Sequence, residues 1–247
     1  MRFKYTLEYD GTKYSGWQIQ KNTRTVQGTL VKCIKTMLEE TKGKSAYGDF
    51  YGSGRTDKGV HALAQTAHLE CETMLAPHIQ KMKMNDMLPT DINILNVERV
   101  ANSFHARHSA TGRQYLYVIS KRRTAFEKKY VWWVRDTLDV TEMKTLAELL
   151  KGFRDFRSFS EPDPNNKSTL VDLEFIELTE TEDKIYIRIK ASHFLWKMVR
   201  RIVGTLVEAG RGNIGAKEIR KYLKSYSKDP AIFTAPPSGL FLEKIFY

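Results

Sequence analysis

The pattern of hydrophobic and polar residues divides the chain into strands and helices that alternate throughout. Apolar side chains take every second position at residues 2–9, which is typical of a half-buried strand. From Thr25 to Glu40 they recur at helical spacing, and Thr25 stands where an N-cap is expected. Further strands are predicted at 66–71, 92–100, 110–119, 170–178, 184–191 and 240–247, and further helices at 77–87, 141–153, 194–209 and 215–227.

This order of elements predicts an α+β protein with two halves of similar design. In each half, antiparallel strands are expected to carry helices on one face. We place the boundary after residue 102, which gives an N-terminal half of residues 1–102 and a C-terminal half of 103–247. The polar segment 160–167 is predicted to be a loop within the second half and not a linker between domains.

The charge balance narrows the class of partner. The chain of 247 residues has 40 Lys and Arg against 29 Asp and Glu, a net charge of +11. Such an excess favours a polyanionic partner, either a nucleic acid or an anionic membrane surface. A helix that spans a membrane is not expected, because every apolar stretch is shorter than about 18 residues. The first residues, MRFKYTLEYDG, lack the apolar core of a signal peptide.

The two cysteines, Cys33 and Cys71, indicate neither a disulfide framework nor a metal site. No Cys or His spacing typical of zinc ligands occurs, so we expect no bound metal. Cys33 falls on the apolar face of a predicted helix and is expected in the core. A chain with two cysteines and no disulfide framework is consistent with a reducing cytoplasm.

One run, GSGRTDKGVHA at residues 52–62, concentrates glycines and charged side chains. It fails as a phosphate-binding Walker loop, because Val60 stands where lysine is required. It fails as a dinucleotide fingerprint, because Asp57 takes the place of the third glycine. The GxSxG pattern of a nucleophile elbow is absent.

What remains is an aspartate, Asp57, two residues after Arg55. In an extended segment these side chains share a face, and a nearby guanidinium favours the charged carboxylate. Asp57 is then suited to attack an electrophile or to accept a proton. The alternative is an aspartate that bonds only to its own turn.

Five segments in the right order resemble the tRNA pseudouridine synthase A (TruA) family. The GSGRTDKGVHA run looks like its signature, and FHARHSATGRQYLYVI looks like its central motif. The other three are YDGTKYSGWQIQ with TVQG, FLWKMVRRIVGTLVEAGRG and PPSGLFLEKIFY. Together they cover most of the chain.

This resemblance implies a cytoplasmic isomerase that turns uridine into pseudouridine in the anticodon stem-loop, at positions 38–40 of tRNA. It implies two ferredoxin-like (RRM-like) halves whose antiparallel sheets join across a central basic cleft. It also implies a homodimer that binds tRNA and no membrane, and that needs no cofactor or metal. Two other functions stay open: a paralogue that modifies another tRNA site or ribosomal RNA, and a catalytically silent RRM-like RNA-binding module.

Carried over residue by residue, the resemblance assigns catalysis to Asp57, Arg55 and Tyr115. Asp57 would be the essential carboxylate, as nucleophile or base. Arg55 would pair with it or fill the space left by an extruded base, and Tyr115 would stack on the uracil and move a proton. Substrate binding would fall to Tyr115, Arg200, His61, Arg107, Lys197 and Arg201, with His61 also shaping its loop.

The sequence departs from the family pattern at two places. Leu195-Trp196-Lys197 stands where many members have a polar, often histidine-containing pair, and Gly112 replaces a commoner side chain. Because both are expected along the RNA path, they bear on which RNA is modified.

Overall fold

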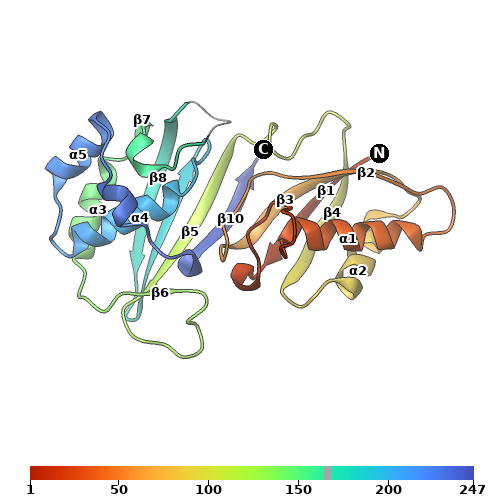
Figure 1. Cartoon of the computed structure of the whole chain (residues 1–247), viewed down its shortest axis with the longest axis horizontal. Helices are drawn as coiled ribbons and strands as arrows, with labels where there is room; N and C mark the ends of the chain where they lie inside the picture. Colours follow the sequence, from red (N-terminus) through yellow and green to blue (C-terminus); the bar gives the residue numbers. More distant parts are fainter. Residues whose placement is uncertain (164–167) are drawn as a thin grey trace. The chain divides into compact units, whose positions relative to one another are not determined.

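The computed structural model describes residues 1–163 and 168–247, and this part of the chain forms two compact units. Unit 1 comprises Met1–Thr111 and Leu242–Tyr247, and unit 2 comprises Gly112–Phe241 (Figure 1). Both mix helices with mostly antiparallel strands, as the α+β class predicts. The units differ from the predicted halves because the last residues of the chain return to unit 1. Of the predicted loop 160–167, residues 164–167 lie outside the described residues.

The strands of unit 1 surround β1, which is buried on one face. β1 pairs antiparallel with β3 on one side and β4 on the other, while β2 and β10 border β3. Alternate residues of β1 are buried, which confirms the alternation predicted for residues 2–9. The strands are β1 (Arg2–Tyr9), β2 (Ala46–Gly52), β3 (His61–Glu72), β4 (Ile92–Val100) and β10 (Leu240–Phe246).

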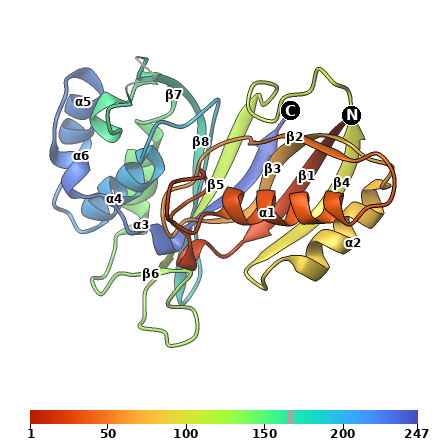
Figure 2. The same cartoon turned by 45° about the vertical axis from the view of Figure 1, so that its right-hand side comes forward.

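Two helices, α1 (Val26–Glu39) and α2 (Pro77–Met87), lie side by side and cover these strands (Figures 1 and 2). The predicted N-cap is confirmed, because Thr25 Oγ1 accepts a hydrogen bond of 3.2 Å from the Gly28 N–H. Each fully buried aliphatic or aromatic side chain stabilises the fold by about 1.5–3 kcal/mol. The core includes Tyr5, Leu7, Leu30, Ile34, Met37, Phe50 and Leu69.

The strands of unit 2 follow the order β5-β9-β8-β7, and each neighbouring pair is antiparallel. The short β6 adds to β5 in parallel orientation. The strands are β5 (Gly112–Ser120), β6 (Trp132–Trp133), β7 (Gly152–Asp155), β8 (Leu170–Glu180) and β9 (Lys184–Ala191).

α4 is buried along most of its length, and α3 and α6 pack against it. Met198, Ile202 and Leu206 are fully buried, as their spacing predicted. Asp139 caps α3, since its Oδ1 accepts a 2.9 Å hydrogen bond from Glu142 N–H. The helices are α3 (Val140–Glu148), α4 (Met198–Gly210), α5 (Ala216–Lys224) and α6 (Asp229–Ile232), with 3₁₀ turns at Gly11–Lys13, Arg157–Phe159 and Pro237–Gly239.

Three predicted boundaries were wrong by four or five residues, each for a tertiary reason. The helix predicted to reach residue 153 ends at Glu148, because Gly152–Asp155 pair with β8 as a strand. The helix predicted from residue 194 begins at Met198, because Lys197 takes a left-handed conformation with φ 62°. β3 begins at His61 and not at residue 66, since its first residues pair with the end of β1.

Neither cysteine is in a disulfide, and their burial differs. Cys71 is buried, and this burial raises the pKa of its thiol to about 11. Cys33, predicted to be in the core, is only partly buried on α1, although desolvation still raises the pKa of its thiol. Within the described ranges, every helix is too short or too polar to cross a bilayer.

Candidate active site

The loop that carries Asp57 joins β2 to β3 in unit 1, and a buried glutamine braces its first part. Ser53 Oγ donates a 2.6 Å hydrogen bond to Gln65 Oε1, and Gln65 Nε2 donates one of 3.1 Å to the Gly54 carbonyl. The Gln65 side chain is fully buried in β3. Its position therefore ties the loop to the strand that follows it.

The segment after β1 supports the second part of the loop through backbone contacts. The Trp17 N–H donates to the Thr56 carbonyl at 3.1 Å, and the Gly59 N–H donates to the Tyr14 carbonyl at 3.4 Å. The Tyr9 hydroxyl and Thr56 Oγ1 share a hydrogen bond of 2.8 Å. Thr56, directly before Asp57, is thus held through both its main chain and its side chain.

Two glycines allow this segment to approach the loop so closely. A Cβ on Gly11 would lie 1.9 Å from the Val60 carbonyl oxygen. Gly16 has φ 89°, and a Cβ there would lie 2.6 Å from the Thr56 carbonyl oxygen. Only glycine fits both places without displacing the loop backbone. The motif YDGTKYSGW is therefore the structural support of the Asp57 loop.

Asp57 is half-buried and Arg55 is exposed. As an exposed side chain, Arg55 is accessible to an anionic ligand.

His61 is buried at the start of β3, with an exposed fraction of 1%. Its Nδ1 accepts a 3.1 Å hydrogen bond from the Gly11 N–H and lies 3.2 Å from Asp10 Oδ1. His61 thus joins the loop to the segment after β1.

Tyr115 and Tyr117 lie on β5 in unit 2 and differ in their surroundings. Tyr115 is partly exposed, and its ring meets the edge of Phe194 at a centroid distance of 5.0 Å and an interplanar angle of 87°. Tyr117 is fully buried and donates a 2.7 Å hydrogen bond to the Pro236 carbonyl. Burial raises the pKa of the Tyr117 hydroxyl well above its usual value. Tyr117 is the packed aromatic, and Tyr115 is the accessible one.

A carboxylate, Glu161, organises the N-terminal end of α4. Lys197 Nζ lies 3.2 Å from Glu161 Oε1, and the Arg201 guanidinium pairs with the same oxygen. Arg201 also donates a 2.6 Å hydrogen bond to the Ser160 carbonyl and is 4% exposed. Burial raises the pKa of Glu161, but its bonds to Lys197 and Arg201 outweigh burial and hold the pKa below its usual value.

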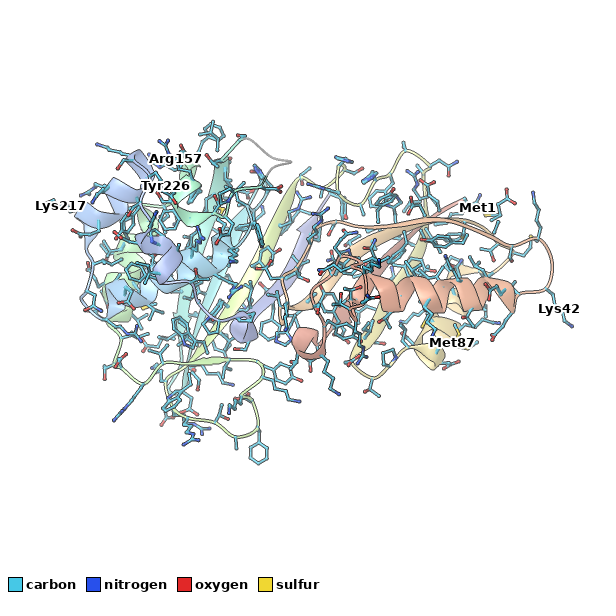
Figure 3. All side chains as sticks on the ribbon, viewed as in Figure 1. Met1, Lys42, Met87, Arg157, Lys217 and Tyr226 are labelled. Carbon is cyan, nitrogen blue, oxygen red and sulfur yellow. The ribbon has the colours of Figure 1, made fainter. Side chains whose placement is uncertain are left out.

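Arg200 and Arg107 are the two remaining predicted binding residues. Arg200 is partly exposed, and its Nε donates a 2.7 Å hydrogen bond to the Ala235 carbonyl. Arg107 is exposed in unit 1, where its N–H donates to His105 Nδ1 at 3.1 Å. On α5, Lys217 extends from the outer side of the helix (Figure 3). All three cations are accessible to a polyanion.

Replacing Glu161 by glutamine is expected to lower the free energy of unfolding by about 1–3 kcal/mol, because Arg201 stays buried without its carboxylate. Folding lowers the pKa of Glu161, so this contribution is present above the usual pKa near 4.5 and is lost as pH falls through the lower folded value. Urea unfolding at pH 7 and pH 3 measures both effects.

Glu98→Gln is the matched control, because Glu98 forms an ion pair of 2.9 Å with Lys4 that is largely exposed. Its cost is expected to stay below about 1 kcal/mol. Equal losses from both variants at pH 7 would contradict a special role of Glu161.

A hollow of about 710 Å³ lies elsewhere in unit 1 and includes no residue of the Asp57 loop. Ile19, Arg24, Lys32 and Met87 are among the residues that line it. In the described part of the chain, no three His, Cys, Asp or Glu side chains are grouped as a metal site would require.

Sequence reasoning missed several residues that support the site. Gln65 and Glu161 gave no signal, because their partners are remote in sequence. Gly11 and Gly16 did give a signal, because two glycines at this spacing beside aromatic residues suggest that two backbone segments approach closely.

Comparison with known proteins defines the class. The family model described as tRNA pseudouridine synthase matches residues 6–109 and 146–247. Arg55, Asp57 and Arg200 lie within these ranges, and Tyr115 lies between them. A tRNA pseudouridine synthase A from Thermoanaerobacter sp. (strain X514) is 40% identical over 98% of this chain and 97% of its own.

A tRNA pseudouridine synthase A 2 from Clostridium perfringens (strain 13 / Type A) is 39% identical over 99% of this chain and 98% of its own. The solved structure of an H/ACA RNP bound to a substrate RNA containing 2′-deoxyuridine has a TM-score of 0.34 at 12% identity, over 83% of this chain and 43% of that chain, too low to support an argument. The chain belongs to the tRNA pseudouridine synthase family, which is a family of isomerases.

Proposed function

We propose that this enzyme converts uridine to pseudouridine in the anticodon stem-loop of tRNA, at positions 38–40, and works as a cytoplasmic homodimer. The observation that carries the proposal is the support of the Asp57 loop. Thr56 is held through its carbonyl and its side-chain hydroxyl, and the next residue, Asp57, is half-buried. Such preorganisation is what a catalytic carboxylate requires. The relatives' names supply the tRNA substrate.

The chemistry is an isomerisation without net gain or loss of atoms. The bond from C1′ of the ribose to N1 of the uracil breaks, the base turns, and C1′ joins C5. The proton on C5 leaves and N1 gains one. Asp57 acts by attack on the base, by attack on the sugar carbon or as a base that removes a sugar proton, and the Tyr115 hydroxyl moves a proton when the new bond forms.

The predicted binding residues divide into those that contact RNA directly and those that position other residues of the site. Arg55, with its exposed guanidinium, fills the space that the extruded uridine leaves. Arg200, Arg107 and Lys197 bind phosphates. Arg201 and His61 are buried, so we assign them a positioning role in place of the direct contact that the resemblance implied.

The family resemblance extends to the fold as a proposal. Unit 1 follows the order β1-α1-β2-β3-α2-β4, with β1 between β3 and β4 and with β2 beside β3. This order is the one that a ferredoxin-like half requires. The central basic cleft stays a prediction.

Nucleotide-resolution mapping of pseudouridine in total tRNA, with and without the purified enzyme, tests the proposed function. New pseudouridine at positions 38–40 is the expected result. Product only elsewhere in tRNA or in ribosomal RNA would identify a paralogue with another target. No product, together with tight RNA binding, would identify a silent binding module.

Affinity for tRNA is expected to fall by about 10- to 500-fold between 50 and 200 mM salt, if about two to five phosphates are contacted. The reason is the release of counterions when a chain of net charge +11 binds RNA. Filter binding over this range measures the slope, and an affinity that is independent of salt would contradict the assignment of the cations to phosphates.

A further inference from the structure

Trp196, directly before α4, is an exposed tryptophan in a fixed place. Its exposed fraction is 53%, although large aromatic side chains are mostly buried. In sequence it takes part in the Leu195-Trp196-Lys197 departure from the family pattern.

The backbone around Trp196 is held at several points. The Trp196 carbonyl accepts a 3.0 Å hydrogen bond from the Glu161 N–H, and the next residue, Lys197, has φ 62°. Lys197 Nζ lies 5.5 Å from the centroid of the Trp196 ring and 3.2 Å from Glu161. A left-handed lysine is costly, and it persists only where its surroundings require it. The exposed ring is therefore presented by a constrained backbone.

The same turn connects Trp196 with the accessible tyrosine of β5. Phe194, two residues before Trp196, packs edge-on against Tyr115 at 5.0 Å. Arg200 follows one helical turn later and is partly exposed. An aromatic ring with Lys197 beside it, and with Arg200 four residues further along the chain, matches a nucleobase and its phosphate in both shape and charge.

We propose that Trp196 stacks on the nucleotide next to the target uridine in the RNA. The inference rests on the proposed function. When a target base leaves its stack, the neighbouring base loses a stacking partner, and an aromatic ring can replace it. The ring then holds the open conformation of the RNA and contributes to the choice of target.

The fluorescence of Trp196 tests this contact directly, because stacking on a base quenches an indole. Titration with tRNA is expected to quench the wild-type protein and to quench Trp196→Phe much less. Trp133→Phe is the matched control: Trp133 is also exposed, at 43%, and has Arg123 at 6.0 Å from its ring. This control is expected to retain the quenching. Full quenching of Trp196→Phe with bound tRNA would overturn the inference.

Steady-state kinetics gives a second readout. Trp196→Ala is expected to raise KM for tRNA by about 5- to 150-fold with kcat nearly unchanged, since one base–aromatic stack is lost. Trp196→Phe retains a ring and is expected to stay within about threefold of the wild type. A wild-type KM in the alanine variant, or equal losses in both variants, would overturn the proposal. Unchanged thermal unfolding of each variant excludes misfolding as the cause.

The two proposals can fail separately. If the wild type forms no pseudouridine but Trp196 is quenched by tRNA, the proposed function fails and the RNA contact is supported. If the wild type forms pseudouridine, but Trp196→Ala leaves KM unchanged and Trp196→Phe leaves the quenching unchanged, the stacking inference alone fails.

Discussion

Replacing Asp57 by asparagine is expected to lower the rate of pseudouridine formation by at least about 10²- to 10⁴-fold, and further if the carboxylate is a nucleophile. The amide keeps the shape of the side chain but supplies neither a nucleophile nor a base. The loop should remain folded, because hydrogen bonds from Gln65, Trp17 and Tyr9 support it. Tritium release from tRNA labelled at C5 of uridine measures the rate.

Asp49→Asn is the matched control for this experiment. Asp49 lies on β2, before the same loop, and is also partly buried. Its replacement is expected to change the rate by less than about threefold, as for a surface substitution away from the chemistry. Tritium release by Asp57→Asn at the wild-type rate would remove Asp57 from catalysis, and loss of tRNA binding would point to misfolding instead.

Adding one methyl group at Gly11 or Gly16 is expected to have the largest effect on the structure. Each alanine variant should lose about 2–4 kcal/mol of unfolding free energy, because the new Cβ would collide with loop backbone at Val60 or Thr56. Because that loop carries Asp57, the rate should fall as well, by about 100-fold, even where the variant remains folded.

Gly54→Ala is a matched control within the loop itself. A Cβ on Gly54 would meet no heavy atom within 4 Å, and its φ is not in the left-handed region. Its unfolding free energy is expected to stay within about 0.5 kcal/mol of the wild type. Thermal and urea unfolding compare the three variants. Wild-type stability in Gly11→Ala would show that the segment after β1 does not support the loop.

Local pattern predicted much of the fold. The strands at residues 2–9, 92–100 and 184–191 and the helix at 77–87 have the predicted bounds. The strand at 2–9 shows a clear alternation of buried positions, and the helix begins at Pro77, a residue that favours the first helical position. The wrong boundaries at 148 and 198 have remote causes. One is the pairing of β7 with β8, and the other is the left-handed turn at Lys197, which Glu161 helps to hold.

In the candidate site too, some features follow from the sequence and others only from the structure. The residue chemistry of the GSGRTDKGVHA run is enough to single out Asp57, since few other roles suit such a loop. The pairing of Arg55 with Asp57 stays a prediction, because sharing a face of an extended segment does not fix the contacts of two side chains. Arg200 and Arg201 are neighbours in sequence and looked alike. In the structure, Arg201 is buried against Glu161 and Arg200 is partly exposed.

The order of residues alone was sufficient for the α+β class, the basic character, the candidate loop and the family, since each depends on composition or on neighbours along the chain. Three features were decided only by the folded chain: why YDGTKYSGW needs its glycines, which cations are accessible, and how Trp196 is presented. Each depends on contacts between groups that are remote in sequence. The local pattern of residues does not determine which remote groups come into contact.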